Sequence, residues 1–160
     1  MPQITLILHN IRSTHNVGSI FRTAEGFGVR KIILSGYTPY PEMNGDTRLP
    51  HIRDKLTNQI HKTALGAEKL VDFEYVEHIE SWLDETRQPV VALEQTDSNV
   101  DIDQFTPPTE FALLLGEEVS GISQELLNKT YASIEIPMRG QKESFNVSVA
   151  TGVALYALTT

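Results

Sequence analysis

The sequence contains no cysteine among its 160 residues. This absence excludes disulfides, thiolate nucleophiles and cysteine-ligated zinc, and it fits a reducing compartment, so we expect a cytoplasmic protein. No run of about 20 apolar residues is present, and no basic segment leads into an apolar one, so we expect neither a membrane helix nor a signal peptide. The five histidines show no spacing typical of metal ligands. We therefore predict no metal site.

Positive charge is also scarce, with 13 Lys and Arg against 21 Asp and Glu and a net charge of −8. Because phosphate contacts need Lys and Arg, the total argues against a nucleic-acid partner. The distribution changes this interpretation. Residues 68–110 carry 12 acidic and two basic residues, whereas residues 1–62 carry four acidic and eight basic ones. We expect an acidic face turned away from any nucleic acid and a weakly basic face elsewhere.

The length and the ordinary composition, 40% hydrophobic and 21% charged, predict one globular domain over residues 1–160. Short apolar runs typical of strands occur at 4–8, 31–34, 71–76, 90–93, 111–115 and 134–136. Helical periodicity or capping residues indicate helices at 16–28, 77–87, 123–129 and 146–158. This alternation predicts an α/β fold with a mostly parallel sheet and helices on both faces. Residues 37–60, rich in proline and polar residues, are predicted to be a long loop with one helical turn near its end.

The common phosphate-binding fingerprints are missing. Gly26-Phe27-Gly28 lies at the end of a predicted helix, no third glycine follows, and no G-x-x-x-x-G-K is present, which argues against a dinucleotide fold or a P-loop. Instead, glycine and polar residues cluster after three predicted strands, where open α/β sheets bind ligands. These segments are residues 10–24, 115–121 and 136–150.

Taken singly, each segment has a plain structural explanation beside a functional one. Arg22 is either a charge among apolar neighbours that needs an anion, or a surface partner of Glu25 three residues on. Glu117 is either a solvated loop carboxylate or a functional one. Ser144 and Asn146 are either helix caps or site residues.

Together the segments carry a resemblance. They read N-x-G-x-x-x-R-x-A from Asn16 to Ala24, G-E-x-x-x-G from Gly116 to Gly121, and I-P-M-x-G-x-x-x-S-x-N-V-S-V-A from Ile136 to Ala150. In this order they resemble the three motifs of the SPOUT superfamily, in its SpoU/TrmH branch of S-adenosyl-L-methionine-dependent RNA ribose 2′-O-methyltransferases. The resemblance covers residues 4–158. It implies a SPOUT-like fold with a C-terminal trefoil knot, a homodimer, and tRNA or rRNA as the substrate.

The resemblance also implies roles for single residues. Arg22 corresponds to the catalytic arginine, and the polar residues expected to act with it are Asn16, Glu117, Ser144 and Asn146. The expected cofactor pocket is formed by Leu93, Gly116, Ile136, Met138, Ser144, Phe145, Asn146 and Val147. Because a guanidinium stays protonated, we expect Arg22 to stabilise developing alkoxide charge and to bind a phosphate, with Glu117 orienting it. RNA contacts are expected at Arg12, Arg22, Arg48, Arg53 and Arg139.

Two other functions remain open at this point. One is a non-catalytic RNA-binding or assembly protein on the same scaffold, and the other is a nucleotide-binding α/β module of a different type. The presence of the whole polar set favours the enzyme over the first, and the missing phosphate loop argues against the second. The loop 37–60 is either an RNA contact or a plain solvated loop.

Overall fold

The computed structural model describes residues 1–160 and contains one seven-stranded sheet, in the order β3-β2-β1-β6-β4-β7-β5. All of its strand pairs are parallel. The strands are β1 (Gln3–His9), β2 (Lys31–Ser35), β3 (Phe73–Val76), β4 (Val90–Leu93), β5 (Val100–Asp101), β6 (Glu110–Leu115) and β7 (Ala132–Glu135). The helices are α1 (Thr14–Gly26), α2 (Pro50–Ala64), α3 (Ile79–Glu85), α4 (Gln124–Leu127) and α5 (Val147–Thr159), with 3₁₀ turns η1 (Ala67–Lys69) and η2 (Ile102–Gln104). The predicted α/β class is confirmed.

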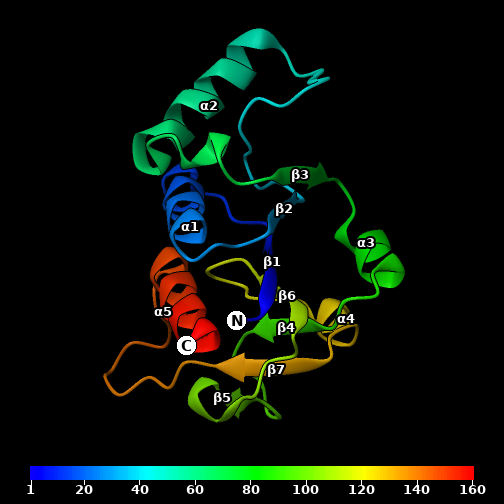
Figure 1. The fold of residues 1–160 in the computed structure, drawn as a ribbon, viewed down its shortest axis with the longest axis vertical. Helices are drawn as coiled ribbons and strands as arrows, with labels where there is room; N and C mark the ends of the chain where they lie inside the picture. The colour runs from blue at the N-terminus through cyan, green and yellow to red at the C-terminus, as the bar shows by residue number, and fades with distance from the viewer.

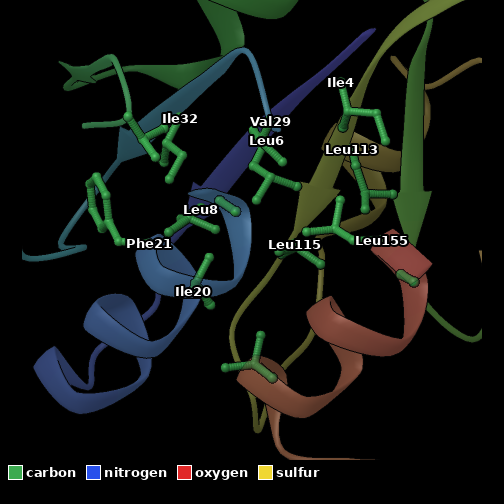
Figure 2. Close-up of a cluster of buried hydrophobic side chains, with 14 of the residues drawn as sticks. Ile4, Leu6, Leu8, Ile20, Phe21, Val29, Ile32, Leu113, Leu115 and Leu155 are labelled. Carbon is green, nitrogen blue, oxygen red and sulfur yellow. The ribbon is translucent and has the colours of Figure 1, made fainter. Parts of the chain in front are cut away.

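Helices cover both faces of the sheet, with α1 and α5 on one side and α3 and α4 on the other (Figure 1). Successive residues of a strand point to opposite faces, so β1 supplies two cores. Leu6 and Leu8 pack with residues of α1 and α5 in the larger cluster (Figure 2), whereas Ile7 packs in the smaller one with residues of α3 and α4. Burying each such side chain stabilises the fold by about 1.5–3 kcal/mol. This two-sided burial is why the strands are continuous apolar runs in the sequence.

The prediction of a loop over residues 37–60 is wrong in its second half, because α2 begins at Pro50 and continues to Ala64. Proline is favoured in the first turn of a helix, where its missing N–H costs nothing. Only Ile60 and Ala64 of this helix are buried, so its sequence carries a weak apolar pattern. Smaller differences are the later start of β3, the earlier start of β7, and the unpredicted β5, η1 and η2.

The sheet places the three motif segments at one edge. Because neighbouring β1, β6, β4 and β7 are parallel, their carboxyl ends lie at the same edge, and the segments that follow them meet there. No helix is both long and apolar enough to cross a bilayer, and no group of three or more His, Asp or Glu is placed to hold a metal ion.

Candidate active site

A cavity of about 400 Å³ lies at this edge, enclosed by the segments after β4, β6 and β7 and by the start of α5. All of the predicted cofactor residues except Asn146 line it: Leu93, Gly116, Ile136, Met138, Ser144, Phe145 and Val147. These residues come from four separate parts of the chain, so the sheet order is what brings them together. Their role in binding a cofactor stays a prediction.

The cavity is both apolar and acidic. Half of its 20 lining residues are hydrophobic, and no Lys, Arg or His is among them. Its carboxylates are Glu94, Glu117, Glu118, Glu135 and Glu143. A wall of this kind repels phosphates and favours a ligand that combines an apolar ring with a cationic group.

Glu94, which sequence reasoning did not single out, fixes the loop that follows β6. Its carboxylate accepts hydrogen bonds from the backbone N–H of Ile122 and of Gln95, each over 2.9 Å. Gly121 has a left-handed φ of +67°, and a Cβ there would lie 2.2 Å from Glu94 Oε2. Gly121, the last glycine of the second motif, is therefore required for two reasons. Its left-handed backbone disfavours other residues, and a side chain there would collide with Glu94. The only sequence signal for Glu94 was its position directly after Leu93, at the end of β4.

Asn16 connects the three motif segments. It is 6% exposed in the first turn of α1, where Ser13 caps the helix by accepting from its backbone N–H over 3.1 Å. The Asn16 amide donates to Glu118 Oε1 over 2.5 Å and accepts from Asn146 Nδ2 over 3.3 Å. Asn146 in turn caps α5, accepting from the N–H of Ser148 over 2.9 Å. Asn146 is thus a helix cap and a link to Asn16, and its expected part in closing the cavity stays a prediction.

Comparison with known proteins identifies the family. Residues 3–156 match the model of the SpoU rRNA Methylase family. The chain belongs to the SpoU family. Among curated relatives, the 23S rRNA (guanosine-2'-O-)-methyltransferase RlmB of Coxiella burnetii is 29% identical over 157 residues, which are 97% of this chain and 57% of that protein.

Two solved structures are similar over almost the whole chain. The AdoMet-bound rRNA methyltransferase from Sinorhizobium meliloti is 25% identical with a TM-score of 0.78, covering 97% of this chain and 55% of that one. The A. aeolicus TrmH/SpoU tRNA modifying enzyme is 25% identical with a TM-score of 0.75, covering 99% and 75%. The predicted resemblance to the SpoU/TrmH branch is confirmed. The chain spans about half the length of the curated relatives it matches.

In this SpoU chain the two neighbouring glutamates of the second motif differ in their contacts. Glu118 contacts Asn16, whereas Glu117 lies against the Tyr37 hydroxyl. The pKa of Tyr37 is raised by loss of solvent around its hydroxyl and by the hydrogen bond to Glu117. The structure shows no hydrogen bond or ion pair between Glu117 and Arg22, and the expected orienting role of Glu117 stays a prediction.

Arg22 is exposed on α1 and forms no ion pair, neither with Glu25 nor with another carboxylate. The alternative of a surface pair with Glu25 is therefore wrong, and the expected binding of an anion stays a prediction. The next residue, Thr23, lies close to α5. A Cβ added to Gly152 of that helix would be 3.7 Å from the Thr23 methyl group. Arg22 thus presents an uncommitted guanidinium close to the contact between α1 and α5.

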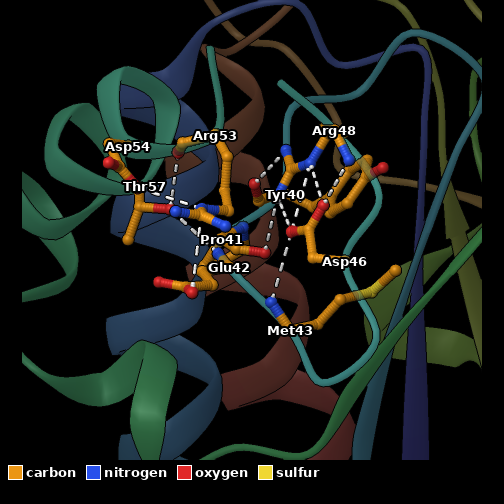
Figure 3. A network of polar contacts seen from close by, with 9 residues as sticks. All are labelled: Tyr40, Pro41, Glu42, Met43, Asp46, Arg48, Arg53, Asp54 and Thr57. Carbon is orange, nitrogen blue, oxygen red and sulfur yellow. Dashed lines mark hydrogen bonds and ion pairs between the residues drawn. The ribbon is translucent and has the colours of Figure 1, made fainter. Parts of the chain in front are cut away.

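The other arginines predicted to contact RNA differ in their availability. Arg12 and Arg139 are exposed, and Arg53 pairs with Asp54 over 3.0 Å. Arg48 instead forms an ion pair with Asp46 over 2.6 Å and donates to two backbone carbonyls (Figure 3). The Arg48 guanidinium holds the pKa of Asp46 well below its usual range. Arg48 anchors its own loop, and this position does not support its predicted role as a surface contact to RNA.

Proposed function

We propose that this chain is an S-adenosyl-L-methionine-dependent RNA methyltransferase that modifies a ribose 2′-hydroxyl of tRNA or rRNA. The observation that carries the proposal is the acidic, half-apolar cavity bounded by the second and third motifs, with Asn16 linking the first motif to both. The family supports it, since the C. burnetii relative is named a guanosine-2′-O-methyltransferase and the S. meliloti structure is AdoMet-bound. The proposal includes the predicted C-terminal trefoil knot.

The residues that line the cavity fit this cofactor. Leu93, Ile136 and Met138 offer apolar contacts to an adenine ring, and Ser144 offers a hydroxyl. S-adenosylmethionine carries a sulfonium and an ammonium group, and the glutamates of the wall complement both. When bound, it supplies an electrophilic methyl group. The absence of cations from the wall keeps the phosphates of the RNA outside.

The residues of the chain must then help a weak nucleophile. As the ribose oxygen bonds to the methyl carbon, that carbon's bond to sulfur would break to leave a thioether, and the hydroxyl proton would pass to water; Arg22 stays protonated, so it is not the base. Its uncommitted guanidinium is suited to stabilising the developing negative charge and an adjacent phosphate. Asn16, on the same helix, has its amide held by Glu118 and Asn146. Holding the reactants in line contributes as much as about 7–11 kcal/mol.

We also infer that the protein is a homodimer. Helix α5 exposes an apolar stripe with i, i+4, i+7 spacing, formed by Val149 at 51%, Val153 at 40% and Tyr156 at 64% exposure. Such a face on one side of a helix is typical of a protein interface.

The experiment that tests the enzyme proposal is calorimetry with S-adenosylmethionine, followed by mass mapping of 2′-O-methyl nucleotides in total RNA from cells with and without this gene. We expect saturable binding of the cofactor and the loss of one or a few 2′-O-methyl groups in the cells without the gene. The position of the lost groups identifies the RNA. No binding of the cofactor would refute the proposal and leave a non-catalytic RNA-binding function.

A further inference from the structure

A second cavity, of about 560 Å³, is lined by the segment that leads into α1 and by the segment after β2. We call it the tyrosine pocket, because its lining includes Tyr37, Tyr40 and Tyr75 together with Arg12 and Arg48. No Asp or Glu is among its twelve lining residues. Arg48 is paired with Asp46, so Arg12 is the lining arginine that forms no ion pair.

Tyr37 is held in an exposed position by a fixed turn. Tyr37 is 47% exposed, and its backbone N–H donates to Asn10 Oδ1 over 3.1 Å. Asn10 and Gly36 both have left-handed φ, +57° and +64°, and a Cβ on Gly36 would lie 1.9 Å from Asn10 Oδ1. A left-handed residue other than glycine is uncommon and persists where the surrounding structure imposes it.

The residue after Tyr37 completes this anchorage. The buried Thr38 hydroxyl donates to the Leu8 carbonyl over 2.9 Å and accepts from the Ile11 N–H over 3.0 Å. The turn is thus bonded to the end of β1 on both sides of Tyr37. The exposed ring is presented by a rigid backbone, which lowers the entropy cost of binding a ligand.

The back of the tyrosine pocket is equally fixed. Tyr40 and Tyr75 stack with their ring centroids 4.3 Å apart. The Arg48 guanidinium lies 3.7 Å from the Tyr40 centroid, and Figure 3 shows these two side chains together. The Tyr75 hydroxyl donates to the Gly36 carbonyl over 2.5 Å. These contacts join the aromatic wall to the turn that presents Tyr37.

The tyrosine pocket is next to the candidate active site. Its lining residues Arg12, Ser13 and Thr14 shortly precede Asn16, and Glu117 of the acidic cavity is near enough to the Tyr37 hydroxyl to raise its pKa. The Arg12 guanidinium lies 5.4 Å from the Tyr37 ring centroid, so a cation and an exposed ring face the same space.

We propose that the tyrosine pocket binds an unpaired nucleobase of the RNA substrate, stacked on Tyr37, with a neighbouring phosphate at Arg12. This inference rests on the proposed function, and it adds single-stranded RNA as the form recognised. Aromatic rings bind bases of any sequence by stacking, and arginine binds phosphate. A base within a duplex cannot reach a pocket of this kind. The cavity size lies within the range of ligand pockets, about 300–1,000 Å³, and Arg12, which forms no ion pair, is available to a phosphate.

The test compares two fluorescent probes of equal charge, an oligoadenylate of about ten nucleotides and a ribose-phosphate chain of the same length without bases. Their ratio of affinities isolates the contribution of the bases. We expect the wild-type protein to prefer the oligoadenylate, and Tyr37→Ala to reduce this preference by about 5- to 140-fold, the range that corresponds to stacking of one base. Tyr37→Phe keeps the ring and should keep the preference. Tyr131→Ala is the matched control, because Tyr131 is 67% exposed and lines a different cavity.

The outcomes separate this inference from the proposed function. Loss of the preference in Tyr37→Ala, with S-adenosylmethionine binding unchanged by calorimetry, supports the tyrosine pocket. An unchanged preference in Tyr37→Ala, an equal loss in Tyr131→Ala, or no preference in the wild-type protein would overturn it while leaving cofactor binding intact. A wild-type protein that binds oligoadenylate through Tyr37 but does not bind the cofactor would instead refute the enzyme proposal alone.

Discussion

Replacing Gly18 by alanine tests why the first motif contains a glycine on α1. A Cβ at this position would lie 2.1 Å from Thr63 Oγ1, 2.3 Å from the Ile60 carbonyl oxygen and 3.0 Å from the Ala64 nitrogen, all on α2. The Thr63 hydroxyl already donates to the His15 carbonyl over 2.8 Å. Two of the three obstacles are backbone atoms, so α2 must move away from α1 to make room.

The expected loss can be worked from three contributions. Overpacking a well-packed contact costs about 1–3 kcal/mol, and loss of the hydrogen bond from Thr63 costs about 0.5–1.5 kcal/mol. Alanine returns about 1 kcal/mol through its higher helix propensity. We therefore expect Gly18→Ala to lower the free energy of unfolding by about 0.5–3.5 kcal/mol.

Urea unfolding followed by circular dichroism measures this free energy, and Gly26→Ala is the control. Gly26 is in the same helix, and a Cβ there meets nothing within 4 Å. We expect Gly26→Ala to be neutral or stabilising by as much as about 1 kcal/mol. Adding Thr63→Ala to Gly18→Ala should restore only part of the loss, because the Ile60 carbonyl remains. A Gly18→Ala protein as stable as Gly26→Ala would refute the packing explanation.

Three further changes have expected outcomes. Asp46→Asn leaves the partly buried Arg48 without its anion and should lower the free energy of unfolding by about 3–5 kcal/mol. The pKa of Asp46 is lowered in the folded state, so the stabilisation from this ion pair is complete above the ordinary carboxyl pKa near 4 and is lost as the pH falls. Asp46→Asn should therefore lose less stability than the wild type when both are unfolded by acid. Val153→Glu should convert the dimer to a monomer in analytical ultracentrifugation, and a wild-type monomer would contradict the proposed interface. Arg22→Ala should bind S-adenosylmethionine like the wild type in calorimetry but lose methyl transfer, and unchanged turnover would contradict its catalytic role.

The sheet was predictable from the sequence because its strands are buried on both faces. Runs such as 90–93 and 111–115 are apolar throughout, without the polar residues that a loop or a surface helix would contain. They correspond to β4 and to most of β6. Helix α2 was not predictable in the same way, because its own pattern is mostly polar. It is stabilised by tertiary packing on α1, at Gly18, which a one-dimensional pattern does not report.

The candidate site was predictable as a set of segments and not as a set of contacts. Motif order placed Gly116, Ile136 and Ser144 around one cavity. The choice between adjacent Glu117 and Glu118 depends on the path of a loop, so the sequence could not show which of them contacts Asn16. The tyrosine pocket was also out of reach, since it depends on the left-handed turn that links two strand ends.

The most direct test of the central claim is methyl transfer from isotopically labelled S-adenosylmethionine to RNA isolated from cells without this gene, with the product nucleosides identified by mass spectrometry. The proposal predicts that the wild-type protein places the label on a ribose 2′-oxygen and that Arg22→Ala places none. Label on a base, or no label with a protein that fails to bind the cofactor, would contradict it.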